Sequence, residues 1–186
     1  MQDRFWTFVG GNTGQWRIVD VRPVVGEGLA CAPRLEILND DDAVIRPEES
    51  WRLRGVTGNT RYTNRSEQNQ LAAVQEGLGR PAATLAALIP IRKNAAWWAL
   101  TQDERRAIFE EQSRHVAVGL KYLPAIARRL HHCRDLGDAK PFDFLTLFDY
   151  ANSDEPAFDE MLGIMRGSEE WKYVDREVDI RMIRVD

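Results

Sequence analysis

One segment, SRHVAVGLKYLPAIARRLHHCRD, spans residues 113–135 and holds all three histidines of the chain, His115, His131 and His132. A neutral imidazole is a common metal ligand. An arginine guanidinium is a permanent cation whose fork of donors binds small anions, and the segment has arginines on both sides of Pro124. These residue types predict a metal ligand and an anion-binding cation within one short stretch of chain.

His115 has the spacing of an axial haem ligand. Ile108, Gln112, His115 and Gly119 would form one stripe of a helix over residues 101–123. An apolar residue before the histidine and a glycine after it would leave room for a flat ligand against that helix. The alternative is a partly buried histidine with a purely structural role, and spacing alone favours that alternative.

The other basic residues of the segment fit structural roles more readily. His131 and His132 are adjacent, so on a strand they point to opposite faces and cannot easily share one metal. One core and one surface residue is the favoured interpretation. Arg129 and Arg134 suit a solvated face, whereas Arg128, just beyond Pro124, would bind an anion if it faced a cavity.

Two further motifs carry groups that could serve a cofactor. In RKNAAWW, Lys93, Trp97 and Trp98 form either an interfacial aromatic pair with a solvated lysine or a site for carboxylates such as haem propionates. In RGSEEWKY, Glu169 and Glu170 are either solvated, or one of them accepts a hydrogen bond from the second nitrogen of a ligand histidine.

Composition excludes several protein classes. The chain has 186 residues, a net charge of -4 and no P-loop, GxGxxG, HExxH or CxxC motif. A nucleic-acid binder would usually be basic, and no apolar run approaches the roughly 18 residues that span a bilayer. We expect a cytoplasmic protein, since no signal peptide is visible and Cys31 and Cys133 form no disulfide framework.

The spacing of apolar residues predicts the helices and strands that must position these side chains. Short β-branched and aromatic runs predict strands at residues 6–11, 16–25 and 50–57, and an acidic surface loop at 39–50. Residues 66–81 carry a weak helical pattern that stops at Gly77 to Pro81. The second half has strands at 84–93, 125–133, 142–150 and 173–185. Its helices are 101–123, opened by a capping box of Thr101 and Glu104, and one opened by Asp154 and Pro156.

This β-α-β-β-α-β order predicts a ferredoxin-like α+β fold, with an antiparallel sheet and helices on one face. We expect two parts, a shortened ferredoxin-like half over residues 1–78 and a complete one over residues 79–186.

Together, ALIPIRKNAAWW, SRHVAVGLKYLPAIARRLHHCRDL, FDFLTLFDY and MRGSEEWKYVDREVDIR resemble the chlorite dismutase family, most closely its short, dimeric lineage. The resemblance covers residues 80–184. It implies a dimeric α+β barrel that binds haem b, with His115 as proximal iron ligand and Arg128 as distal arginine. It selects Glu169 as the partner of His115. The remaining cofactor contacts and pocket walls it implies are Lys93, Trp97, Trp98, Arg61, Tyr62, Thr146 and Phe148.

The activity implied by this resemblance is conversion of chlorite to chloride and dioxygen through ferryl and hypochlorite intermediates. The expected partners are chlorite and a second copy of the chain, without nucleic acid or membrane. The alternatives are a coproheme decarboxylase or peroxidase-like enzyme of the same fold, a non-catalytic haem-binding protein, and a haem-free α+β-barrel protein. Arg128 argues against the decarboxylase, because such enzymes typically lack the distal arginine.

Overall fold

The computed structural model describes residues 4–39, 45, 47–58, 60–137 and 140–185. Within this part of the chain, eight strands form one closed antiparallel barrel in the order β1-β3-β2-β8-β5-β7-β6-β4. The strands are β1 (Phe5–Gly11), β2 (Trp16–Val25), β3 (Arg34–Leu38), β4 (Trp51–Val56), β5 (Leu85–Lys93), β6 (Ala127–His132), β7 (Phe144–Tyr150) and β8 (Val174–Arg184).

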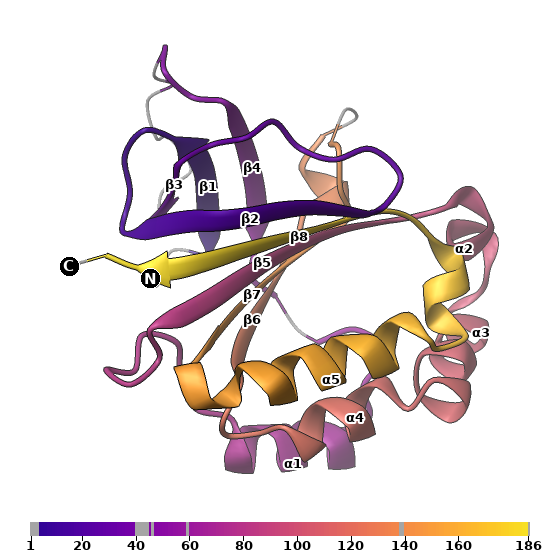
Figure 1. The fold of residues 1–186 in the computed structure, drawn as a ribbon. Helices are drawn as coiled ribbons and strands as arrows, with labels where there is room; N and C mark the ends of the chain where they lie inside the picture. The colour runs from indigo at the N-terminus through magenta and orange to yellow at the C-terminus, as the bar shows by residue number, and fades with distance from the viewer. Residues whose placement is uncertain (1–3, 40–44, 46, 59, 138–139, 186) are drawn as a thin grey trace.

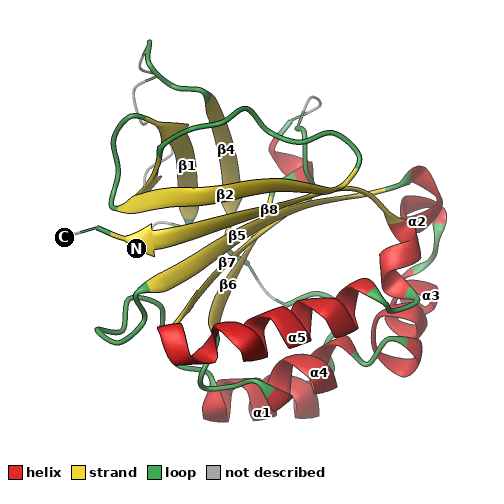
Figure 2. Ribbon diagram, in the orientation of Figure 1, coloured by secondary structure: helices red, strands yellow, loops and turns green. Residues whose placement is uncertain are grey.

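The helices gather beside the second half of the barrel. Figures 1 and 2 show α1, α4 and α5 together on one side of β5 to β8, with α2 and α3 at one end of this layer. The helices are α1 (Arg65–Val74), α2 (Ala95–Ala99), α3 (Gln102–Arg106), α4 (His115–Lys121) and α5 (Glu155–Arg166). None of them is long and apolar enough to cross a membrane.

The two halves of the barrel repeat one strand order. Strands β4-β1-β3-β2 and strands β8-β5-β7-β6 both follow the 4-1-3-2 order of a ferredoxin-like sheet. The seam between β2 and β8 is long, whereas the seam between β4 and β6 has a single residue pair, Val56 with His132. The predicted α+β fold with an antiparallel sheet and helices on one face is confirmed. The division at residues 78/79 stays a prediction.

Strand β5 is buried on both faces because it separates two apolar clusters. Ala86 and Leu88 face the barrel interior, where they join β7 and β8 residues such as Leu145 and Ile180. Alternate β5 residues such as Ile89 face the helical layer. The apolar cluster between β5 and α5 therefore also includes residues of the segment 113–135, such as Tyr122 and Ile126.

The predicted helix over residues 101–123 is wrong as one continuous element. The capping box of Thr101 and Glu104 is present, but α3 passes into a π-helix at Ala107–Gln112. Arg114 then adopts a left-handed conformation with φ of 53°, and α4 begins at the next residue. The expected stripe from residue 108 to 119 is therefore interrupted: Ile108 and Gln112 lie in the π-helix, whereas His115 and Gly119 lie in α4.

Two smaller differences concern the first half. The weak helix predicted at 66–81 is α1, which begins one residue earlier and is capped by Asn64. The short strand β3 was not predicted, and it completes the strand order of this half. Of the predicted acidic loop at 39–50, residues 40–44 and 46 lie outside the described residues.

Candidate active site

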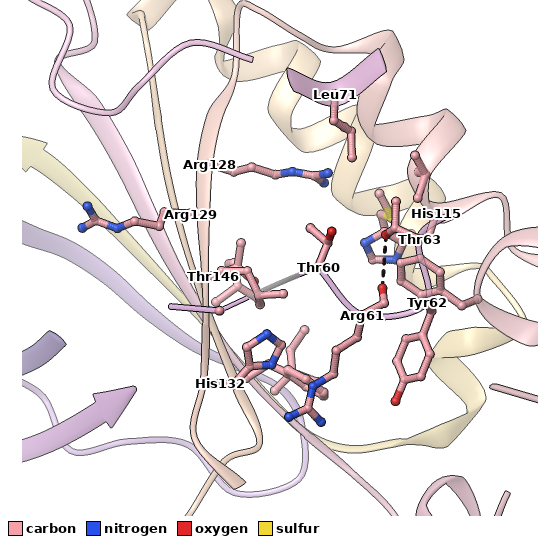
Figure 3. A pocket seen from close by; sticks show the side chains of 18 of the residues that line it. Thr60, Arg61, Tyr62, Thr63, Leu71, His115, Arg128, Arg129, His132 and Thr146 are labelled. Carbon is pink, nitrogen blue, oxygen red and sulfur yellow. Dashed lines mark hydrogen bonds between the residues drawn. The ribbon is translucent and has the colours of Figure 1, made fainter. Parts of the chain in front are cut away.

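A cavity of about 600 Å³ lies between the helical layer and the sheet of the second half. Its walls come from α1, α4 and α5 on one side and from β5, β6 and β7 on the other. Figure 3 shows the side chains of His115, on α4, and Arg128, on β6, pointing into this space from opposite walls. The expected metal ligand and the expected anion-binding cation therefore share one cavity.

The imidazole of His115 is held by a buried carboxylate. Its Nδ1 lies 2.7 Å from Oε2 of Glu170, and Oε1 of Glu170 accepts a hydrogen bond of 2.8 Å from Nζ of Lys93. The side chains of Glu170 and Lys93 are only 7% and 4% exposed. Because Nδ1 is engaged by the carboxylate, Nε2 is the ring nitrogen left for a metal.

Glu169, the expected partner of His115, is the wrong residue of the pair. Its carboxylate is half exposed and forms a 2.6 Å ion pair with Lys172 at the surface. The two glutamates stand at the start of a 3-10 turn, Glu170–Tyr173, and so leave the chain in different directions. The inward one is also anchored through its backbone, because the N–H of Glu170 donates to Oγ of Ser113 at 2.9 Å.

Lys93 also differs from expectation. Its ammonium lies over the rings of Trp97, at 4.5 Å from the centroid, and Trp171, at 5.5 Å, and its ion-pair partner is Glu170. The lysine therefore supports the carboxylate that holds His115 and is not aimed at a carboxylate ligand. Burial lowers the pKa of Lys93, although the charge of Glu170 opposes this shift.

Opposing effects set the charge of Glu170. Burial alone would raise the pKa of its carboxyl group, but the charges of His115 and Lys93 and their hydrogen bonds outweigh burial and lower the pKa to about 2. Glu170 is therefore an anion at neutral pH. A carboxylate on Nδ1 fixes the tautomer of the ring and makes Nε2 a stronger electron donor to a metal.

The start of α4 is fixed by the preceding π-helix, which fixes His115 as well. The ring of Phe109 stacks on the imidazole with centroids 4.3 Å apart. The carboxylate of Glu110 accepts hydrogen bonds from the backbone N–H groups of Val116, at 2.6 Å, and Ala117, at 3.3 Å. Neither residue was predicted, because their roles depend on the π-turn, and no spacing pattern marks it.

Arg128 presents an uncompensated charge to the cavity. Its backbone carbonyl accepts a hydrogen bond of 3.0 Å from Nε2 of Gln75, but its guanidinium has no hydrogen-bond or ion-pair partner among the described residues. Burial lowers the pKa of Arg128, yet a guanidinium remains charged at any physiological pH. A partly buried cation without a partner among these residues is suited to bind an anion.

One end of the cavity holds two polar atoms without partners in the described part of the chain, the hydroxyl of Tyr62 and Nε1 of Trp97. Both residues line the cavity, and their rings meet edge to face at 5.8 Å. Arg61 lines it too and pairs with Asp135 at 3.0 Å. Buried donors of this kind usually have a partner, so a ligand with acceptor oxygens would satisfy them.

Of the remaining residues expected at the cofactor site, two line the cavity and one does not. Thr146 and Phe148 line the cavity, as expected. Trp98 does not, and its assignment to a cofactor site is wrong. Its Nε1 donates to Asp143 at 3.3 Å, and its ring lies under the guanidinium of Arg134 at 3.9 Å. Adjacent residues of the short helix α2 point about 100° apart, so only one of the two tryptophans can face the cavity.

The paired histidines of β6 point to opposite faces, as predicted. His131 is fully buried against Phe8, and its Nδ1 lies 3.0 Å from the carbonyl oxygen of Leu145. Burial lowers the pKa of His131 to about 4. The expectation of one core and one surface histidine is wrong, because His132 is only 8% exposed and lines the cavity on the same strand face as Arg128.

Comparison with known proteins gives consistent results. Residues 40–184 match a protein family described as chlorite dismutase. A chlorite dismutase from Ideonella dechloratans is 30% identical over 123 residues, which are 65% of this chain and 40% of that protein. The chain thus spans about 40% of the length of this curated relative.

Solved structures extend the similarity over the whole chain. The crystal structure of a dimeric chlorite dismutase from Nitrobacter winogradskyi is 54% identical, with a TM-score of 0.88, and the match covers 97% of this chain and 99% of that one. A chlorite dismutase from Candidatus Nitrospira defluvii in complex with imidazole is 27% identical, with a TM-score of 0.58, over 73% of this chain and 55% of that one.

Proposed function

Since this chain belongs to the chlorite dismutase family, we propose that it converts chlorite to chloride and dioxygen with a haem b bound through His115. The observation that carries the proposal is the shared cavity. A carboxylate-supported histidine and an unpaired arginine face it from opposite walls. The overall reaction turns one chlorite ion into one chloride ion and one dioxygen molecule, so it needs no added oxidant or reductant.

The residues of the cavity fit a haem. Nε2 of His115 is available as the axial ligand, and its Nδ1 has the carboxylate partner that metal-binding histidines usually have. The unpartnered hydroxyl of Tyr62 and Nε1 of Trp97, together with Arg61, would meet the two propionate groups. The largely apolar walls, including Ile89 and Phe148, suit the porphyrin ring.

When bound, the haem iron would supply the oxygen-atom transfer chemistry that no side chain can perform. The protein supports that chemistry from the proximal side through Glu170. Because this carboxylate stays ionised, it keeps a proton of His115 on Nδ1 and strengthens electron donation from Nε2. Lys93 balances the charge of the buried carboxylate, so the glutamate remains in place.

Arg128 would act on the substrate. Its unpaired guanidinium attracts the chlorite anion into a cavity of low dielectric constant and orients it by charge-assisted hydrogen bonds. Hypochlorite, the chlorine-containing intermediate, is also an anion or its weak acid, so the same cation would retain it until dioxygen forms. Phe148 and Met161 would limit water near the oxidant.

We also propose that the chain forms a homodimer. The support is its similarity along nearly the whole chain to a protein described as dimeric. The shortened first half agrees with this proposal, because within the described residues no helix connects β1 to β2 or β3 to β4 (Figure 2).

The test is dioxygen release from haem-loaded protein on addition of chlorite, followed with an oxygen electrode. We expect rapid evolution of about one dioxygen per chlorite. Haem uptake without dioxygen would favour a non-catalytic haem-binding protein, and loss of haem carboxyl groups from coproheme with peroxide would favour the decarboxylase. Protein that takes up no haem would exclude every haem-dependent reading.

A further inference from the structure

We infer that Gly119 is a positioning residue for Arg128: its missing side chain lets the guanidinium rest against α4 and so determines where the cation stands in the cavity. This inference rests on the proposed role of Arg128. It concerns a residue on the histidine's helix, one turn beyond His115, that touches no atom of the reaction itself.

The contact is defined by geometry. A Cβ atom at position 119 would lie 2.8 Å from Nη1 of Arg128 and 3.4 Å from both Cζ and Nη2. These three atoms are the head of the side chain, so the whole guanidinium faces the backbone of α4. No side chain larger than hydrogen fits at position 119 while Arg128 keeps this position.

The backbone conformation does not require a glycine at position 119. Gly119 is buried within a helix of seven residues, and its φ is not positive. Glycine inside a helix costs about 0.5–1 kcal/mol relative to alanine because of its backbone entropy. Close approach of another group is the usual compensation, and the three nearest atoms outside the helix backbone all belong to Arg128.

Alanine at position 119 would displace the guanidinium of Arg128 and leave the backbone of α4 in place. The atoms that it meets are the far end of a flexible side chain, which can move, whereas the backbone of α4 gains helix propensity. Among the described residues, no carboxylate forms an ion pair with the guanidinium in its present position. Gly119→Ala is therefore expected to leave the protein folded and to disturb the position of one charge.

Gly163 provides a matched control. It lies inside α5, is exposed, and a Cβ atom there would meet nothing within 4 Å. Gly163→Ala thus reproduces the change in helix propensity without a displaced neighbour. A difference between the two alanine variants reports the contact with Arg128.

The experiment is a double-mutant cycle with Gly119→Ala and Arg128→Ala, read by cyanide affinity of the haem-loaded protein from the absorption spectrum. We expect Gly119→Ala to weaken cyanide binding by about threefold or more, and to have no effect once Arg128 is removed. Gly163→Ala should behave as the parent. An unchanged affinity in Gly119→Ala, or the same change with and without Arg128, would overturn the inference.

A second measurement needs no haem. In NMR spectra of the haem-free protein, the side-chain Nε–H resonance of Arg128 is assigned by its loss in Arg128→Lys. This resonance should shift in Gly119→Ala and stay in place in Gly163→Ala. An unmoved resonance would also overturn the inference. Both readouts are independent of dioxygen release, so a protein inactive on chlorite would refute the proposed function and leave the Gly119 contact to be decided by them.

Discussion

Glu170 stands 2.7 Å from Nδ1 of His115, although its neighbour in the sequence, Glu169, points to the surface. The pair therefore offers a substitution and its own control. Glu170→Gln leaves Lys93 buried without its counter-ion, so we expect the free energy of unfolding to fall by about 3 kcal/mol. Haem affinity should fall about tenfold or more, because the ligand histidine loses its carboxylate partner.

Glu169→Gln removes only an exposed ion pair with Lys172, whose contribution is at most about 1 kcal/mol. Urea unfolding and haem titration of both variants measure the contrast. Equal effects of the two substitutions would show that the carboxylate on His115 has been assigned to the wrong residue.

Acid unfolding should proceed in two windows. The pKa of His131 is lowered from 6.5 to about 4, so the unfolded chain takes up this proton first and stability falls as the pH drops from 6.5 to 4. The pKa of Glu170 is lowered from 4.5 to about 2, so its contribution is complete above pH 4.5 and is lost as the pH drops towards 2.

Urea unfolding of the haem-free protein at a series of pH values measures both windows. His131→Gln should flatten the slope between pH 6.5 and 4, which corresponds to about 3 kcal/mol, and should leave the slope below pH 4 in place. A parental slope in the upper window would mean that His131 accepts its proton in the folded protein.

His115→Ala should abolish the histidine-ligated haem spectrum and weaken haem binding by more than about 100-fold. His132 is the matched control, because it lines the same cavity from β6. His132→Ala should keep the axial ligand and its spectrum. If His132→Ala instead lost the ligand field and His115→Ala kept it, the iron ligand would be His132.

A site residue can be predicted from the sequence when its position depends on neighbouring residues. It cannot be predicted when its position depends on contacts with residues far away in the sequence. Residue type and spacing mark His115 and Arg128 only as candidates, and their roles as ligand and distal cation follow from the family resemblance. The strands that carry the site follow from short apolar and β-branched runs. The break before His115 cannot be predicted, because Arg114 is left-handed without the glycine that usually marks such a conformation. The helix axis therefore changes at a position that reads as ordinary helix.

Adjacent candidates are the second limit. Glu169 and Glu170, like Trp97 and Trp98, have the same chemistry and differ only in direction. The direction is set by contacts remote in the sequence, such as the bond from Glu170 to Ser113, 57 residues away. Local patterns carry no information on such contacts, and so each pair had one member assigned to the wrong place.

Arg128→Ala should keep haem binding but lower kcat/KM for chlorite by about tenfold or more, because the cation that attracts and retains the anion is lost. Hypochlorite should then escape, so a chlorination-sensitive dye would react and the dioxygen yield per chlorite would drop. Arg134→Ala is the control, since Arg134 stacks on Trp98 outside the cavity. Parental rate, yield and lifetime in Arg128→Ala would refute the assigned role.

Replacement by phenylalanine should affect haem affinity differently at the two adjacent tryptophans. Trp97→Phe removes an Nε1 donor that has no partner among the described side chains, but it also shrinks a fully buried ring that lies under Lys93. The free energy of unfolding of haem-free protein should therefore fall by about 1–3 kcal/mol through the cavity alone. Haem affinity should fall about fivefold if this donor meets a propionate.

Trp98→Phe instead breaks the 3.3 Å hydrogen bond to Asp143 and the stack with Arg134, so it should lower stability by about 1 kcal/mol and leave haem affinity unchanged. Haem titration separates the two variants, and urea unfolding shows that each remains folded. A loss of haem affinity in Trp98→Phe but not in Trp97→Phe would place the propionates on the other side of α2. It would also mean that the unpartnered N–H of Trp97 serves some other ligand of the cavity.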